Sequence, residues 1–408
     1  MNAMTPHAPI TSISGQKGLP RYYAQVHSVL GRLSAGQLDM VLPDGSLFRY
    51  EGDGHGPVAR VNVRNDQLFV RVLREGDNAF AEAYMEGWWD TPDLQAVLDV
   101  FVMSNEAVVR EMPGTSVVRT YERLRHWLRS NSKSQARKNI SYHYDLGNSF
   151  YGLWLDDTMT YSSALFREGQ ESLEQAQTNK YAQICDTLDL APGAHVLEIG
   201  CGWGGFAEYA AKERGLRVTA LTISQEQHDY AVERMKRQGL EGQVDIVMRD
   251  YRDETGQYDG IASIEMFEAV GEKYWPTYFD SVHARLKPGG HGTFQIITIA
   301  DELFPVYRKS VDFIQKYIFP GGMLPSPSAL RNQIQRAGLV ETGSVEFGKS
   351  YSDTLRRWYE TFNARWDEIE LLGFDERFRR MWNFYLTSCA ATFLTGVNDV
   401  TQITVRRA

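Results

Sequence analysis

Residues 196–205 read Val-Leu-Glu-Ile-Gly-Cys-Gly-Trp-Gly-Gly, an apolar run that leads directly into a cluster of glycines. The apolar half is typical of a buried strand, and the glycines predict a loop after it. Without side chains the backbone can turn tightly, and a ligand can approach it closely. The stretch therefore predicts the first strand and the ligand loop of an α/β fold that binds a nucleotide-like molecule.

Strands and helices alternate from about residue 175 onward. Short apolar strand candidates lie at 196–199, 216–221, 244–248, 260–264 and 292–299, with helical segments such as 205–214 and 225–238 between them. This alternation predicts a mostly parallel, doubly wound (Rossmann-like) α/β sheet with helices on both faces and helical insertions. We assign it to a domain at 141–408, whose part from 320 to 400 is rich in aromatic residues and is predicted to be mostly helical.

The N-terminal part is smaller and is predicted to be of mixed α+β type. Strand-like alternation occurs at 46–50 and 61–64, and helical spacing occurs at 79–89 and 94–103. We expect a domain at 21–115, preceded by a disordered lead-in at 1–20 that lacks the apolar centre of a secretion signal.

Composition excludes several classes of protein. A chain of 408 residues can bury a large core in more than one structural unit. The net charge of −9 argues against nucleic-acid binding. The three cysteines are scattered without metal-ligand spacing, so we expect a reduced, cytoplasmic protein without a metal site. No apolar run is long enough to span a membrane.

A basic segment interrupts the acidic chain between the two domains. Within a linker helix predicted at 116–140, residues 119–138 carry seven Lys or Arg residues against one acid, Glu122, with Tyr, Leu and Trp interleaved. Such a helix can lie on an anionic membrane surface. The alternative is a solvated connector whose Arg stems cover apolar surface, and composition alone favours the connector.

The polar residues that follow the strands decide which ligand the loop takes. A dinucleotide site needs an acid at the end of the second strand, but that strand ends in Leu221-Thr-Ile-Ser-Gln. Gln227 follows and can hydrogen-bond ribose hydroxyls, while Asp250 can accept from an adenine amino group with Tyr251 stacking beside it. Together these residues predict S-adenosylmethionine. The alternatives are a solvated helix-face role for Gln227 and a turn-cap role for Asp250.

Further motifs make the chain similar to a known family. It resembles the cyclopropane-fatty-acid synthases and the related mycolic acid cyclopropane synthases over roughly residues 140–400. The resemblance rests on the glycine loop and on Tyr142-His-Tyr-Asp-Leu-Gly-Asn, Met159-Thr-Tyr-Ser-Ser-Ala, Leu221-Thr-Ile-Ser-Gln-Glu-Gln, Glu265-Met-Phe-Glu-Ala-Val-Gly, Lys316-Tyr-Ile-Phe-Pro-Gly-Gly-Met-Leu-Pro-Ser and Phe347-Gly-Lys-Ser-Tyr.

The resemblance implies a lipid C-methyltransferase that moves a methyl group from S-adenosylmethionine onto a cis double bond in a phospholipid acyl chain. A carbocation forms, and loss of a proton from the new methyl group closes a cyclopropane ring. The resemblance also implies peripheral association with the inner membrane surface, an N-terminal domain for lipid presentation or dimer contact, and a homodimer. The implied cofactor contacts are Tyr144, Tyr161, Ser162, Gly200, Gly202, Thr222, Gln227, Asp250 and Tyr251.

The resemblance further implies a bound bicarbonate as the base that takes the proton. Glu268, Tyr351 and the backbone N–H of Ile299 match ligands of that ion in the family. Two positions depart from the family, because Ser163 stands in place of a Cys and Ile297 in place of a His. Serine can still donate a hydrogen bond, whereas isoleucine can neither donate one nor relay a proton.

Gln295 lies two residues before Ile297 on the same face of the predicted strand, so its amide can partly replace the missing donor. With fewer donors, loss of a different proton or a prior hydride shift gives an alternative product, a methyl-branched or methylene acyl chain. A methyltransferase for a small O or N nucleophile and a lipid-binding protein with a degenerate cofactor fold also stay open. The catalytic candidates are Glu268, Tyr351, Ser163, Ile299 and Gln295.

Overall fold

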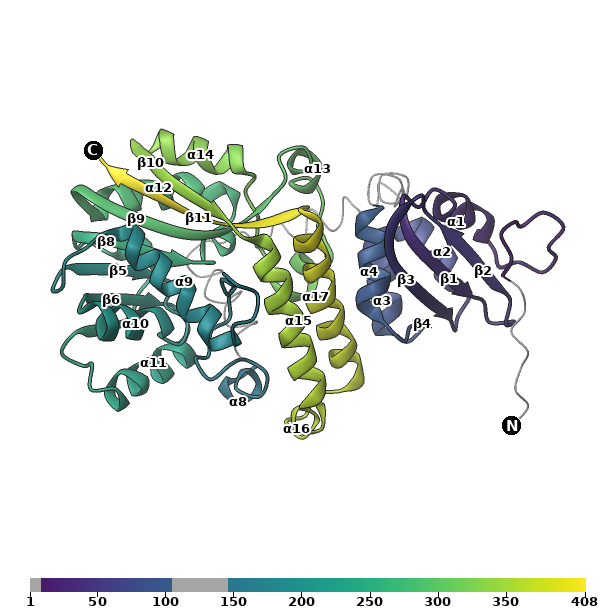
Figure 1. The fold of residues 1–408 in the computed structure, drawn as a ribbon, viewed down its shortest axis with the longest axis horizontal. Coiled ribbons are helices and arrows are strands. Elements are labelled where there is room, and N and C mark those ends of the chain that lie inside the picture. Colours follow the sequence, from purple (N-terminus) through teal and green to yellow (C-terminus); the bar gives the residue numbers. More distant parts are fainter. Residues whose placement is uncertain (1–8, 105–145) are drawn as a thin grey trace. The chain divides into compact units, whose positions relative to one another are not determined.

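The computed structural model describes residues 9–104 and 146–408, which divide into two compact units (Figure 1). Besides its N-terminal residues, the first unit contains residues 310–313 and 373–395. The second unit holds the remaining described residues from 146 onward. The domain boundaries predicted between 115 and 141 fall outside the described residues and stay predictions.

The first unit is built on a four-stranded mixed sheet in the order β2-β1-β3-β4. β1 pairs antiparallel with β2 and parallel with β3. Trp89, predicted at the end of a helix, lies instead in β4, because Gly87 follows that helix with a φ of 72° that a continuing helix cannot adopt. The elements are α1 (Tyr23–Leu30), β1 (Ala35–Val41), β2 (Leu47–Glu51), β3 (Gly54–Val63), α2 (Gln67–Glu75), α3 (Asp77–Met85), β4 (Trp89–Asp90) and α4 (Leu94–Met103).

A helix from the C-terminal part of the chain, α17 (Glu376–Thr395), belongs to the first unit. It packs against α4 and α3. The ring of Phe384 lies 6.1 Å from that of Tyr84, and Gln95 donates to the carbonyl of Thr387 at 3.2 Å. Contacts therefore assign this helix to a unit that a division by sequence position does not predict for it.

The second unit is built on a seven-stranded sheet in the order β10-β11-β9-β8-β5-β6-β7. Strands β5 to β9 run parallel, whereas β11 pairs antiparallel with both β9 and β10. The strands predicted between 196 and 299 are all present, and the doubly wound fold is confirmed. The strands are β5 (His195–Ile199), β6 (Arg217–Thr222), β7 (Val244–Met248), β8 (Tyr258–Ile264), β9 (Leu286–Ile299), β10 (Leu339–Glu346) and β11 (Asn398–Arg407).

The two faces of this sheet bury alternate residues. On β5, Val196 packs in a core cluster with α9 and α10, whereas Leu197 packs in a second cluster with α12 and α14. Because successive strand residues point to opposite faces, helices cover both sides. The helical elements are α8 (Asn148–Tyr151), α9 (Leu173–Leu188), α10 (Gly205–Arg214), α11 (Gln225–Arg237), η1 (Tyr251–Asp253), η2 (Phe267–Ala269), η3 (Glu272–Tyr274), α12 (Trp275–Arg285), α13 (Phe304–Tyr307), η4 (Ile314–Ile318), α14 (Pro327–Arg336), α15 (Gly348–Ala364) and α16 (Trp366–Glu370).

The sequence patterns do not predict β10 and β11. β10 lies at the edge of the sheet and exposes most of its residues, so it shows no clear alternation. β11 is buried over six consecutive positions, but Thr401, Gln402 and Thr404 are among them. A buried strand with this many polar residues shows neither an apolar run nor a period of two.

Candidate active site

The glycine loop connects β5 to α10 at the carboxyl edge of the sheet. The N–H groups of Gly200 and Cys201 both donate to the carbonyl of Leu221 on β6, at 3.0 and 2.8 Å. Gly200 and Gly202 have φ values of 84° and 52°, a region that glycine reaches without strain. The neighbouring strand and these backbone angles together fix the path of the loop.

Gly200 and Gly202 face different surroundings. A Cβ atom on Gly200 would lie 2.7 Å from the side chain of Met266, whereas one on Gly202 would meet nothing within 4 Å. Open space beside the N-terminus of a helix is what close approach of a ligand requires. The loop therefore leaves room for a ligand beside Gly202, whereas Gly200 is packed against Met266; the contacts of both glycines with S-adenosylmethionine stay predictions.

A buried polar pair follows β6. Thr222 donates its hydroxyl to Oε1 of Gln227 at 2.9 Å, and both residues are buried. Ser224 caps α11 and accepts from the backbone N–H of Gln227 at 3.3 Å. Gln227 is only 6% exposed, so its interpretation as a solvated helix-face residue is wrong. Within the described residues its amide nitrogen has no hydrogen-bond partner, which leaves it to donate to a ligand.

Asp250 and Tyr251 follow β7. The Asp250 carboxylate accepts from the guanidinium of Arg252 at 2.8 and 2.6 Å and from its backbone N–H at 3.0 Å, which caps η1. The turn-cap role of Asp250 is therefore confirmed. Tyr251 is half-buried, and its ring lies edge-on to Tyr278 at 5.4 Å. The adenine contacts of Asp250 and Tyr251 stay predictions.

Tyr161 and Ser162 lie in the loop before α9. The ring of Tyr161 is half-buried among aromatic rings, 5.3 Å from that of Trp358 and 5.4 Å from that of Tyr151. Ser162 is buried, and its hydroxyl accepts a hydrogen bond from Nζ of Lys180 at 2.6 Å. Tyr161 therefore belongs to an aromatic wall, and Ser162 holds a buried lysine.

Three hydrogen-bond donors converge on the carboxylate of Glu265, directly after β8. Its Oε1 accepts from the backbone N–H of Ser163 and from Nε2 of Gln295, both at 2.8 Å. Its Oε2 accepts from the hydroxyl of Tyr351 at 2.9 Å. The structure thus brings three predicted catalytic residues together around a glutamate that the sequence analysis did not include in the site.

Glu268 lies three residues further along, in η2. Its Oε1 accepts from the backbone N–H of Ile297, and its Oε2 is buried without a hydrogen-bond partner in the described parts of the chain. Burial, together with the nearby charge of Glu265, raises the pKa of Glu268 to about 8. Glu268 is therefore mostly protonated at neutral pH.

The donors expected to hold a bicarbonate contact protein atoms instead. The Ser163 hydroxyl donates to the carbonyl of Ala164 at 2.9 Å, and the N–H of Ile299 donates to the carbonyl of Pro325 at 3.0 Å. The other expected donors are bound to Glu265. The predicted roles of Ser163 and Ile299 as anion ligands are corrected accordingly, and this set of residues does not fit a bicarbonate.

A buried lysine that the sequence analysis missed faces the same cluster. Lys180 on α9 is fully buried, and the opposite charges that act on it are those of Glu265 and Asp156. Burial lowers the pKa of Lys180, and the two carboxylates oppose that effect. Its position was a usable signal, because it lies four residues before the buried Ile184 and so places a cation on the apolar face of the helix.

Glu198 is a second missed candidate, at the end of β5 and directly before the glycine loop. It is 2% exposed, and its Oε2 has no hydrogen-bond partner among the residues described. Burial raises the pKa of Glu198 to about 8. The residue stands inside the stretch that predicted the loop, where it was interpreted only as part of a strand. A buried acid beside a ligand loop is typical of functional sites.

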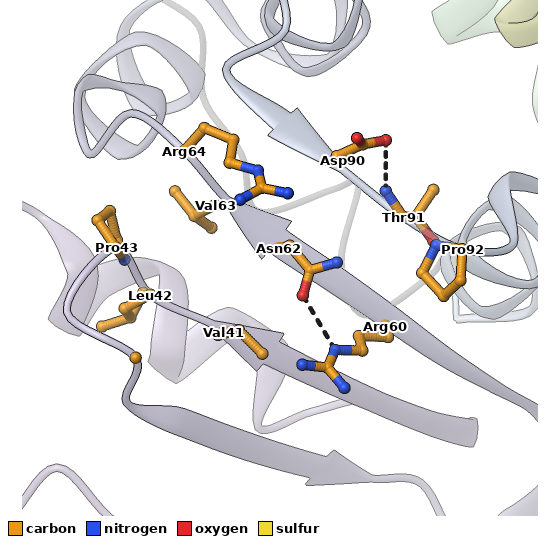
Figure 2. Close-up of a pocket in the computed structure, with 11 residues that line it drawn as sticks. Val41, Leu42, Pro43, Arg60, Asn62, Val63, Arg64, Asp90, Thr91 and Pro92 are labelled. Carbon is orange, nitrogen blue, oxygen red and sulfur yellow. Dashed lines mark hydrogen bonds between the residues drawn. The ribbon is translucent and has the colours of Figure 1, made fainter. Parts of the chain in front are cut away.

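A hollow of about 780 Å³ lies in the first unit, over the ends of β1, β3 and β4 (Figure 2). Arg60, Arg64 and Asp90 supply its charged groups, and Arg60 donates to Asn62 at 2.9 Å. Among the residues that the structure describes, none of the predicted site residues lines it. The hollow is therefore separate from the candidate active site.

Tyr144 and the basic segment 119–138 lie outside the described residues. In the parts that are described, no helix is both long and apolar enough to cross a membrane. The same parts hold no group of His, Cys, Asp and Glu side chains placed to bind a metal ion.

Comparisons with known proteins show which family the chain resembles. A family model described as mycolic acid cyclopropane synthetase matches residues 131–403. Tuberculostearic acid methyltransferase UfaA1 of Mycobacterium tuberculosis is 39% identical over 84% of this chain and 82% of its own. Cyclopropane-fatty-acyl-phospholipid synthase of Escherichia coli is 38% identical over 90% of this chain and 96% of its own. A crystal structure of mycolic acid cyclopropane synthase CmaA1 with SAH and CTAB has a TM-score of 0.63 and 29% identity, and covers 66% of this chain and 98% of that chain.

Proposed function

The chain belongs to the mycolic acid cyclopropane synthetase family of S-adenosylmethionine-dependent methyltransferases, and from that premise we propose that it methylates a cis double bond in a phospholipid acyl chain. The glycine loop and the Thr222–Gln227 pair would hold the methyl donor. The cluster around Glu265 lies after the neighbouring strand β8 and would serve the acyl chain.

The observation that carries this proposal is that the cluster around Glu265 lies next to aromatic side chains. The Tyr351 hydroxyl donates to Glu265, and the Tyr351 ring lies 6.1 Å from that of Trp358. Trp358 is fully buried and lies 5.3 Å from the ring of Tyr161. Aromatic faces stabilise a nearby cation, and a carboxylate accepts a proton. Methyl transfer to an oxygen or nitrogen nucleophile has no need of a wall that stabilises a carbocation.

An alkene is a weak nucleophile, so the reaction depends on orientation and on exclusion of water. S-adenosylmethionine, when bound at the glycine loop, supplies an electrophilic methyl group. The acyl double bond gives its electron pair to that carbon as the carbon–sulfur bond breaks. The positive charge then lies on the acyl chain, where the aromatic wall stabilises it. Proton loss completes the reaction.

We take ring closure as the main outcome, through loss of a proton from the transferred methyl group. A methyl-branched or methylene chain is the second candidate product. Ser163 and Ile297 favour it, because they stand where the family has Cys and His, and so does the relative named tuberculostearic acid methyltransferase. A bicarbonate ion has no place in either route, since its expected donors contact protein atoms.

We also propose that the enzyme binds the anionic inner membrane surface through the basic segment 119–138 and acts as a homodimer. The composition of that segment supports the membrane role, because Lys and Arg next to aromatic residues bind anionic headgroups. A substrate within a lipid leaflet requires such an approach.

Expression of the full chain in a bacterial host that lacks these enzymes tests the function. Mass spectrometry and NMR of the fatty acids should show a mass gain of one methylene group with cyclopropyl protons. Vinylic or branched methyl signals would establish the second product instead. Gly202→Val is the matched control, because its side chain enters the open space beside the loop. No new lipid from a folded protein that binds S-adenosylmethionine in a calorimetric titration would refute the proposal.

A further inference from the structure

We propose that the carboxylate of Glu265 occupies the place of an external bicarbonate and is the base that takes the proton from the carbocation. This assignment rests on the proposed function, because it supplies a group for the last step of that reaction. It replaces a small anion from solution with a side chain of the protein.

The donors that would bind a carboxylate-like anion already donate hydrogen bonds to Glu265. They come from three segments that are far apart in sequence: Ser163 before α9, Gln295 on β9 and Tyr351 on α15. The Gln295 amide is itself oriented, because its Oε1 accepts from Nε2 of Gln402 at 3.0 Å. Its Nε2 therefore points to Glu265. Donors held in this way form an anion site that contains its own anion.

The backbone of Glu265 is fixed in an unfavourable conformation. Its φ is 48°, in the left-handed region that non-glycine residues rarely adopt. Its N–H donates to the carbonyl of Gln295 at 2.8 Å, which holds the residue against β9. Backbone strain of this kind persists where the surrounding structure imposes it, and it concentrates at functional sites. A carboxylate is held here in spite of the strain.

Glu265 retains the capacity to accept a proton. A carboxylate has about four acceptor positions, and the described residues use three of them, two on Oε1 and one on Oε2. The remaining position therefore belongs to Oε2. Glu265 is half-buried, whereas Ser163 and Gln295 are fully buried.

Charge separates the roles of the two neighbouring carboxylates. Burial raises the pKa of Glu265, and the positive charge of Lys180 and the three donors oppose that rise by favouring the ionised form. Glu268 lacks such a cation and accepts from one backbone N–H, so it is mostly neutral at the same pH. The three donors and the nearby cation therefore distinguish Glu265 from Glu268 as the carboxylate that can be ionised and accept the proton.

The step balances without a further reactant. A C–H bond of the transferred methyl group breaks, and its electron pair forms the carbon–carbon bond that closes the ring. The proton moves to Oε2 of Glu265. The acyl chain loses its positive charge, and the carboxylate becomes a neutral acid. After a hydride shift, the same proton loss forms a carbon–carbon double bond and gives the methylene product.

Binding of isotope-labelled bicarbonate, followed by NMR with the full-length protein, tests the occupancy of the site. Glu265→Gly removes the carboxylate, relieves the positive φ and leaves the three donors around vacated space. We expect saturable bicarbonate binding to this variant and none to the wild type. Glu265→Gln keeps the side chain's shape, so it should not bind bicarbonate either. Equal affinity of wild type and Glu265→Gly for bicarbonate would overturn the proposal.

Turnover on vesicles of unsaturated phospholipid, in buffer freed of carbon dioxide, tests the role as base. Wild-type turnover should not depend on added bicarbonate. Glu265→Gln should lose roughly 10²- to 10⁴-fold in turnover, the usual contribution of a general base. Bicarbonate should restore part of the activity of Glu265→Gly but none of that of Glu265→Gln. The control is Glu82→Gln in the first unit, where the carboxylate binds Arg71 and turnover should stay at the wild-type level.

The outcomes separate two failures. Wild-type turnover that falls on bicarbonate removal, or Glu265→Gln turnover equal to that of the wild type, would contradict the role of Glu265. A folded wild-type protein that transfers no methyl group to phospholipid would refute the proposed function instead. In that case the NMR measurement still decides whether Glu265 fills the anion site.

Discussion

Replacing Lys180 by methionine removes the cation that faces Glu265 and keeps most of the buried apolar stem. Lys180 is fully buried, donates to Ser162 at 2.6 Å and lies in the fields of Glu265 and Asp156. Because methionine is unbranched and of similar length, little cavity forms. The variant therefore tests the charge of Lys180 rather than its packing.

The expected cost follows from the charge that stays behind. The charges of Lys180 and Glu265 interact, and removing one of two opposite buried charges costs about 3–5 kcal/mol in the free energy of unfolding where the two form an ion pair. Three hydrogen bonds to Glu265 remain and stabilise its charge, so we expect about 3 kcal/mol, the lower end. Without the lysine, the pKa of Glu265 rises further. Its protonation then relieves the loss, so Lys180→Met should be less destabilised at acidic pH than at neutral pH.

Urea unfolding followed by tryptophan fluorescence measures the effect in a double-mutant cycle. Lys180→Met combined with Glu265→Gln removes both charges, so the two losses should fall short of additivity by about 1–3 kcal/mol. The control is Lys212→Met at an exposed lysine, which should change stability by less than about 0.5 kcal/mol. Additive losses, or a Lys180→Met loss no larger than that of the control, would refute the pairing.

Three further predictions follow from other parts of the molecule. Gly202→Val should weaken S-adenosylmethionine binding about tenfold or more in calorimetric titration, because its side chain fills the ligand's space, and unchanged affinity would place the ligand elsewhere. Burial raises the pKa of Glu198 from 4.5 to about 8, so stability should fall as pH rises between those values. Glu198→Gln should lessen this fall in the free energy of unfolding by at least about 1.4 kcal/mol, the energy of one pKa unit. Urea unfolding at pH 4.5 and at pH 8 measures the fall in both proteins. An equal fall in the wild type and the variant would contradict the assignment. If each basic residue contributes about 1 kcal/mol at an anionic surface, a triple substitution to glutamine should weaken vesicle binding about 100-fold and leave S-adenosylmethionine binding intact, and unchanged vesicle binding would reject the membrane role. The residues substituted are Arg123, Arg125 and Arg129.

Local pattern was sufficient for the central sheet and for the class of cofactor. Strands that alternate with helices bury both faces of a parallel sheet, and the apolar runs of β5 to β9 reflect that burial directly. The absence of an acid after β6 and the presence of Gln227 distinguished S-adenosylmethionine from a dinucleotide, because both features lie within one short stretch of sequence. The same reasoning fails for β11, because several of its buried residues are polar.

The fold class, the position of the glycine loop and the family follow from the amino-acid sequence, because each depends on residues that are neighbours along the chain. The surroundings of Glu265 could be found only from the folded structure. Gln295 lies 132 residues after Ser163 along the chain, and Tyr351 lies further along still. Each of the three nevertheless donates a hydrogen bond shorter than 3 Å to the same carboxylate. Hydrogen bonds act over such short distances that a site built from remote segments exists only once the chain has brought those segments together.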